Sequence, residues 1–196
     1  MVSVAAAGKI AWVVGLLVWY AIRHSFARRA KRARVSTRIR SLSERIGLAA
    51  GALGIAIIPG IYVATGFPRR TEYPPRAWAV ILGAAFYGGA LWLFWRSHKD
   101  LGRNWSVTLE LREEHRVVAN GVYAAIRHPM YASFWLMAVG QALLLPNWFA
   151  GPAALAGIAV LFFLRVGEEE RMMLQAFGEE YRAYMQRTKR IIPRVY

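Results

Sequence analysis

Two charged side chains near residue 165 have the types and the spacing to bind a small charged molecule. Arg165 and Glu169 are four residues apart, so on a helix they share one face. A guanidinium group binds a carboxylate through two parallel hydrogen bonds, whereas a carboxylate binds an ammonium group or a pair of sugar hydroxyls. This face predicts a site for a zwitterion. The alternative is an ordinary salt bridge on a solvated helix, stabilising by only about 0.3–0.5 kcal/mol. The two residues alone leave both interpretations open.

A second polar cluster precedes an apolar stretch, in the order Arg127-His128-Pro129-Met-Tyr131. Proline is favoured in the first turn of a helix, where its missing N–H has no partner in any case. A helix that begins there offers free backbone N–H groups and a partial positive charge, which suit an anionic or polar ligand group. The alternative is a belt at the membrane surface, in which Arg127 extends to water and Tyr131 anchors the chain.

Residues near the end of the chain predict a further amphipathic helix. Met173, Phe177, Tyr181 and Tyr184 recur at helical spacing. One interpretation is a helix that lies on the membrane. The other is a lid over a site formed by the two polar clusters. Pro193 ends this segment.

The sequence lacks the residues that several kinds of chemistry require. The sequence has no cysteine, which excludes thiolate metal sites and a cysteine nucleophile. It has no G-x-G-x-x-G, no P-loop and no serine in a nucleophile elbow. The four histidines do not have metal-ligand spacing, so we expect no metal ion.

The composition indicates which elements position these clusters. Hydrophobic residues make up 57% of the 196 residues and charged residues only 19%, with a mean hydropathy of +0.28. A water-soluble domain of this size could not bury so much apolar surface. The sequence predicts an all-α, polytopic membrane protein with about five spans of roughly 20 residues. The apolar stretches are 2–22, 46–67, 77–95, 130–145 and 148–164. We interpret the last two as a tight helical hairpin and expect a kink at Pro59.

Basic residues predict the orientation in the membrane. Of the 26 Lys and Arg residues, 22 lie in the segments 23–45, 96–128 and 165–196. The positive-inside rule places these segments in the cytoplasm and the N-terminus outside. The net charge of +15 then favours contact with anionic lipid over nucleic-acid binding, because the charges flank membrane spans on one side. The run 23–40 is a solvated loop or, alternatively, a phosphoinositide or partner patch.

The order and spacing of three blocks resemble a known family. The blocks lie in the region 77–196 and surround the predicted hairpin. They are His115-Arg-Val-Val118; Gly121-Val-Tyr123 with Arg127-His128-Pro129-x-Tyr131; and Glu169-Glu170 with Phe177-Gly178-x-x-Tyr181-x-x-Tyr184 and Ile192-Pro193. This pattern is similar to the isoprenylcysteine carboxyl methyltransferase family of integral membrane enzymes, including its prokaryotic members.

The resemblance implies a cofactor and roles for particular residues. The family uses S-adenosylmethionine in a pocket at the cytoplasmic membrane face, formed here by the loop 96–128 and the tail 165–196. Arg165 would bind the carboxylate of the methyl acceptor, and Arg165 and Glu169 would be the catalytic residues. The residues that would contact the cofactor are His115, Val117, Val118, Tyr123, His128, Pro129, Tyr131 and Glu169. Residues 1–76 would form a two-span anchor and residues 77–196 the catalytic core.

The acceptor is expected to be an amphiphile that enters from the lipid and interacts with the membrane. A prenylcysteine-like carboxylate is one candidate, and phospholipid amines and small thiols are others. Two further classes stay open: a sterol-reductase-like enzyme that uses NADPH, and a non-catalytic lipid-binding protein.

Overall fold

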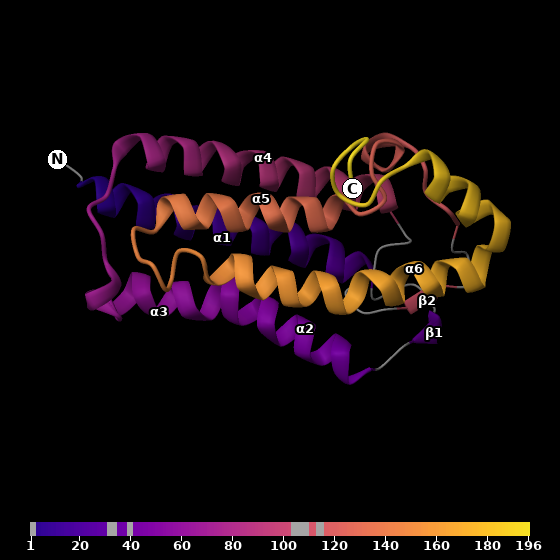
Figure 1. Cartoon of the computed structure of the whole chain (residues 1–196), viewed down its shortest axis with the longest axis horizontal. Helices are drawn as coiled ribbons and strands as arrows, with labels where there is room; N and C mark the ends of the chain where they lie inside the picture. The colour runs from indigo at the N-terminus through magenta and orange to yellow at the C-terminus, as the bar shows by residue number, and fades with distance from the viewer. Residues whose placement is uncertain (1–2, 31–34, 39–40, 103–109, 113–115) are drawn as a thin grey trace.

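The structure is an elongated helical bundle (Figure 1). This computed structural model describes residues 3–30, 35–38, 41–102, 110–112 and 116–196. The helices are α1 (Val4–Ala30), α2 (Leu42–Ala52), α3 (Ile58–Thr65), α4 (Ala77–Leu101), α5 (Pro129–Leu144) and α6 (Ala153–Arg187). Two short 3₁₀ turns cover Arg69–Thr71 and Gly121–Ala124. A small antiparallel ribbon pairs β1 (Val35–Arg38) with β2 (Glu110–Arg112). The prediction of an all-α membrane protein is confirmed, with this ribbon as an addition.

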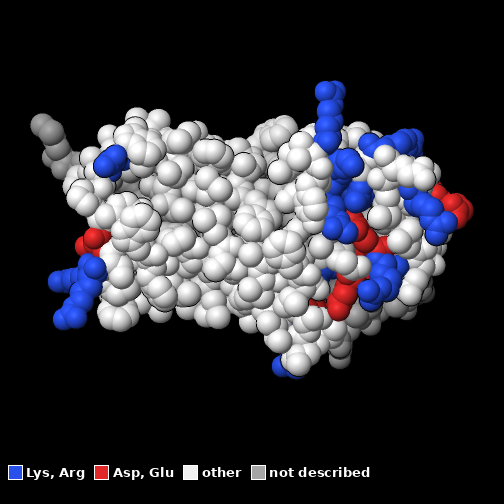
Figure 2. Space-filling view, in the orientation of Figure 1, with Lys and Arg blue, Asp and Glu red and all other residues white. Residues whose placement is uncertain are grey.

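Among the residues that the structure describes, three helical segments are long and apolar enough to cross a membrane: Val4–Arg28, Leu42–Thr65 and Ala77–Leu101. They correspond to the first three predicted spans. The other two predicted spans are also helical, as α5 and the first half of α6. On the face shown in Figure 2, charged side chains gather at the two ends of the bundle, and the surface between them is uncharged. A count of five crossings stays a prediction.

The irregularity expected near Pro59 is present as a widened turn. A π-helical segment, Leu53–Ile57, joins α2 to α3 just before this proline. Proline has no N–H to donate, and inside a helix its ring clashes with the carbonyl four residues earlier. A π-helical turn is one of the local adjustments that relieve this conflict.

The connection between α5 and α6 is longer than predicted. The sequence analysis started the last span at residue 148, after a two-residue turn, but α6 begins at Ala153. Asn147 explains the difference, because its side chain organises a compact loop. Its Oδ1 accepts hydrogen bonds from the amides of Phe149 and Ala150 at 2.9 and 2.8 Å, and its Nδ2 donates to the carbonyl of Pro68 at 2.9 Å.

Small residues let α2 approach α6 closely. A Cβ atom added to Gly157 of α6 would collide with the carbonyl of Ala50, and one added to Gly54 would collide with the carbonyl of Ala153. Gly47 also lies against the backbone of Leu161. Such contacts are typical of membrane helices, where close backbone packing replaces the hydrophobic effect. This packing holds the start of α2 beside the middle of α6.

A buried glutamine joins the helices at their other end. Gln141 of α5 accepts a hydrogen bond from Trp12 of α1 at 3.1 Å. Its amide nitrogen donates to the carbonyls of Gly54 and Ala150 at 3.1 and 3.0 Å. A polar group without partners is costly in an apolar environment, so these bonds fix the relative positions of four chain segments.

We predict that Gly157→Ala destabilises the bundle. The added methyl group collides with the Ala50 carbonyl, and overpacking of this kind costs about 1–3 kcal/mol. Gly88→Ala in α4 is the matched control, because a Cβ atom there meets nothing within 4 Å. Thermal unfolding in detergent measures both variants. Equal stability of the two would contradict the close α2–α6 packing.

Candidate functional site

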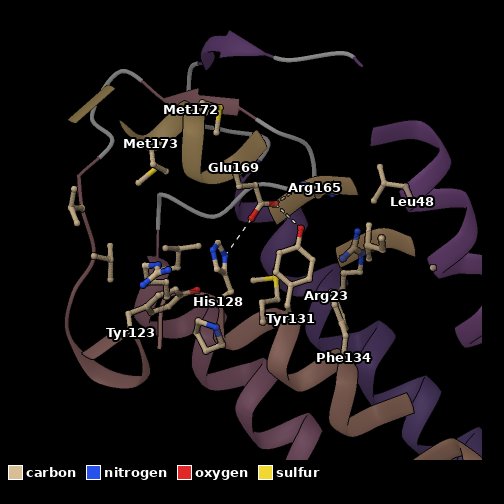
Figure 3. A pocket seen from close by; sticks show the side chains of 18 of the residues that line it. Arg23, Leu48, Tyr123, His128, Tyr131, Phe134, Arg165, Glu169, Met172 and Met173 are labelled. Atoms are coloured by element: carbon tan, nitrogen blue, oxygen red, sulfur yellow. Dashed lines mark hydrogen bonds and ion pairs between the residues drawn. The ribbon is translucent and has the colours of Figure 1, made fainter. Parts of the chain in front are cut away.

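One pocket of about 390 Å³ lies at the end of the bundle that carries most of the visible charge. Side chains from α1, α2, α5, α6 and the segment 116–128 line it (Figure 3). A pocket of this size is in the range that holds a small-molecule ligand.

Nearly all the site residues predicted from the sequence line this pocket. Eight of them line it: Val117, Val118, Tyr123, His128, Pro129, Tyr131, Arg165 and Glu169. The ninth, His115, lies outside the described residues. The two polar clusters, which are more than 30 residues apart in sequence, therefore form one site.

Glu169 is the centre of the polar groups inside the pocket. Its Oε1 lies 3.1 Å from Arg165 Nη2 and accepts a hydrogen bond from Tyr131 Oη at 2.8 Å. Its Oε2 lies 3.6 Å from His128 Nδ1. The Arg165 side chain is only 8% exposed and that of Glu169 22%. The pair is therefore not a salt bridge on a solvated helix, because it faces the pocket from within the protein.

The neighbouring carboxylate, Glu170, binds the C-terminal tail. Its Oε1 lies 3.2 Å from His128 Nε2 and accepts from Arg127 Nε at 3.1 Å, and its Oε2 accepts from Arg190 Nη2 at 2.7 Å. Burial opposes the ionised form, but the hydrogen bonds from His128 and Arg190 and the charge of Arg127 outweigh it. The pKa of Glu170 is therefore well below its ordinary value.

The tail also uses the backbone ahead of α5. The amides of Arg127 and His128 donate to the carbonyls of Lys189 and Arg190 at 2.7 and 2.8 Å. The sequence analysis expected free N–H groups at this helix start for a ligand, and the tail takes these two. The Arg127 guanidinium also donates to the carbonyls of Met185 and Thr188. Arg127 therefore fastens the tail and does not extend to the membrane surface.

The tail folds over the pocket as a lid. Gly178 has a φ of 51°, which breaks the helical path of α6, and Figure 1 shows the chain turning back beyond it. This turn brings Tyr181 and Tyr184 to the pocket lining. Tyr184 Oη donates to the carbonyl of Tyr123 at 2.7 Å. Burial raises the pKa of Tyr184 to about 12, so its hydroxyl stays protonated and can donate.

Asp100 positions the opposite wall of the pocket. Its Oδ2 accepts a hydrogen bond from the amide of Val122 at 3.0 Å and lies 3.4 Å from Arg96 Nε. Gly121 has a φ of 57°, and a Cβ atom there would collide with the Asp100 carboxylate. A glycine is therefore required where the chain turns towards Tyr123.

Sequence reasoning missed the part of the lining that comes from the N-terminal helices. Trp19 and Arg23 of α1 face the pocket, and the apolar residues there are Leu48, Gly51, Ala52, Ile55 and Ala56. The sequence analysis assigned Arg23 to a cytoplasmic loop, but α1 continues through it to Ala30. A weak signal exists, since Trp19 and Arg23 are four residues apart, a spacing that places them on one face of a helix.

Comparison with known proteins shows which family this part of the sequence resembles. Residues 82–175 match the sequence profile described as the isoprenylcysteine carboxyl methyltransferase (ICMT) family. This match covers 94 of the 196 residues, so just under half of the chain resembles the family. The matched region includes the segment 117–131, Arg165 and Glu169, all of which contribute to the pocket wall.

The individual relatives share about a third or less of their residues with this chain over the matched regions. The chain is 33% identical over 94 residues to protein-S-isoprenylcysteine O-methyltransferase B of Arabidopsis thaliana, a match covering 47% of this chain and 48% of that protein. It is 27% identical over 146 residues to a probable protein-S-isoprenylcysteine O-methyltransferase of Oryza sativa subsp. indica, covering 72% and 74%. The match to the human protein-S-isoprenylcysteine O-methyltransferase covers 46% of this chain and 32% of that protein, at 33% identity. The chain thus spans about half of the Arabidopsis protein and a third of the human one.

We predict that Glu170→Gln releases the C-terminal tail from the rest of the protein. The substitution leaves the buried guanidinium of Arg127 without its carboxylate, and breaking such a pair costs about 3–5 kcal/mol. The melting temperature in detergent is expected to fall by about 10 °C. Glu179→Gln is the control, since Glu179 pairs with Arg182 on the exposed surface. A melting temperature as unchanged as that of the control would exclude this role for Glu170.

The same carboxylate predicts a pH dependence of stability. Because its pKa is lowered on folding from an ordinary value of 4.5, Glu170 stabilises the folded state fully above that value. The contribution is lost as the pH falls below about 4.5 towards the folded pKa. The difference in melting temperature between the wild type and Glu170→Gln should therefore be largest near neutral pH and shrink in acid. A difference that grew in acid would contradict the lowered pKa.

Proposed function

We propose that the protein is an integral membrane methyltransferase that moves a methyl group from S-adenosylmethionine to the carboxylate of a prenylcysteine-like amphiphile. The observation that carries the proposal is the position of Arg165 and Glu169. Both side chains are largely buried, yet both line one pocket that has a polar side and an apolar side. The family and the names of its relatives support the reaction class.

The polar side of the pocket fits the cofactor. Glu169 offers a carboxylate to the ammonium group of its amino-acid part, and Tyr131 and His128 hold that carboxylate in place. The rings of Tyr123, Tyr181 and Tyr184 suit the adenine ring and the sulfonium cation, which is attracted to aromatic faces. Val117 and Val118 complete an apolar wall beside them.

The apolar side of the pocket fits the acceptor. Residues of α2 and of the π-helical turn meet Phe134 and Leu161 there, at the border of the apolar surface. A chain of hydrocarbon would lie among these side chains, with its polar end at Arg165. We propose that residues 1–76 supply this wall and that the core 77–196 holds the cofactor. We also propose that the site faces the cytoplasm and that the N-terminus lies outside, as the basic segments predict.

Methyl transfer requires mainly that the acceptor and the methyl group are aligned. The bound cofactor supplies an activated methyl group. A carboxylate acceptor has an ordinary pKa of about 3.5–4, so at neutral pH it is already ionised and needs no general base. The protein then has to hold the acceptor oxygen in line with the methyl group and to exclude water. The lid formed by Tyr181 and Tyr184 would serve the second purpose.

We predict that S-adenosylhomocysteine, the product form of the cofactor, binds the detergent-purified protein with micromolar affinity in calorimetry. Glu169→Gln should weaken this binding about 10-fold or more, because a charged hydrogen bond is lost. Glu168→Gln is the matched control, since Glu168 binds Ser41 and Ser43 and does not line the pocket. NADPH titrated in parallel tests the reductase alternative. Binding of NADPH alone would overturn the proposal, and binding of neither would favour the non-catalytic alternative.

We predict that Arg165→Ala separates binding from turnover. Arg165 lies between the carboxylate that holds the cofactor and the apolar side of the pocket. The variant should bind S-adenosylhomocysteine nearly as well as the wild type but lose methyl transfer to a prenylcysteine. Normal turnover by both Arg165→Ala and Glu169→Gln would show that the site is assigned wrongly.

A further inference from the structure

Arg23 is one of four arginines that line the pocket, together with Arg116, Arg127 and Arg165. It lies on α1, and Figure 3 shows it beside Tyr131, on the side of the pocket towards Leu48. Its guanidinium carbon is 5.4 Å from the centroid of the Trp19 ring, which holds the side chain against the pocket wall. Within the described part of the chain, no Asp or Glu forms an ion pair with it.

The charge of Arg165, by contrast, is already engaged. Its guanidinium lies 3.1 Å from Glu169, and the buried carboxylate of Glu44 on α2 also attracts it. Two acidic groups therefore act on this one arginine. An anionic ligand that approached Arg165 alone would also meet the negative charges of Glu169 and Glu44.

Arg23 and Arg165 repel each other. Both guanidinium groups line the same pocket and carry the same sign of charge. Two cations beside one largely apolar pocket raise the free energy of the empty site, because charges removed from water need partners. An anion that enters between them would reduce this repulsion and bind both.

We propose that Arg23 binds the anionic group of the methyl acceptor and selects acceptors that carry a free carboxylate. The inference rests on the proposed methyltransferase function and adds a specificity-determining residue to it. Arg23 lies outside the matched region 82–175. The apolar side of the pocket begins next to it at Leu48 and continues to Ile55, so the acceptor would place its anionic end between Arg23 and Arg165 and its hydrocarbon chain along α2.

The test compares Arg23→Gln and Arg23→Lys with the wild type, using an N-acylated prenylcysteine as the acceptor. Arg23→Gln should raise the KM for this carboxylate at least about 30-fold, since a desolvated charge pair is lost. The affinity for S-adenosylhomocysteine should stay unchanged. Arg23→Lys keeps the charge and should recover most of the affinity. Arg28→Gln is the matched control, because Arg28 is exposed on the same helix and does not line the pocket.

A second measurement separates recognition of charge from a structural role. The methyl ester of the same prenylcysteine has no negative charge, and its inhibition constant should be the same for the wild type and Arg23→Gln. Equal weakening of acid and ester would mean that Arg23 only shapes the pocket, and an unchanged KM for the acid would mean that it does not bind the acceptor; either result overturns the inference. If the wild type neither binds S-adenosylhomocysteine nor transfers methyl groups, the proposed function itself fails and the inference fails with it.

Discussion

The imidazole of His128 lies between two consecutive carboxylates, and the rest of the site depends on this contact. Its Nδ1 faces Glu169 in the pocket and its Nε2 faces Glu170 on the side of the tail. Consecutive residues of a helix point in directions about 100° apart, so one ring can reach both only when α5 begins directly opposite them. The start of α5, the middle of α6 and the C-terminal tail are thereby held together, and the lid is attached to the residue that also orients Glu169.

These charged groups lie where the apolar surface of the bundle ends, which explains why they are so completely paired. Three consecutive acidic residues follow the apolar part of α6, and each has its own partner: Ser41 and Ser43 bind Glu168, Arg165 binds Glu169, and Arg190 binds Glu170. A charge at the edge of a membrane is costly unless it is neutralised or hydrated. The close packing of α2 on α6 brings Ser41, the N-cap of α2, within reach of Glu168.

The sequence predicted the features that depend on local pattern and missed those that depend on contacts far apart in the chain. Apolar stretches located the main helices, and the motif residues His128, Tyr131 and Glu169 meet in one pocket. A lid was one of two interpretations of the tail, but the break of the helix at Gly178 was not predicted, because it depends on the surface against which Tyr181 packs. The start of α6 was placed five residues early, because hydropathy does not reveal the hydrogen bonds by which Asn147 organises a longer loop.

Arg23 illustrates the same limit at the level of function. In the sequence it is one of many basic residues that follow an apolar stretch, and the positive-inside rule accounts for it without any site. Only the folded bundle brings it to the pocket that Arg165 also lines, where the charge of Arg165 is already balanced by Glu169. Most residues around the proposed cofactor lie in the matched region, whereas Tyr181, Tyr184, this arginine and the apolar wall from α2 lie outside it. The matched region therefore contains most of the proposed cofactor site, and the proposed choice of acceptor depends on α1 and α2, which lie outside that region.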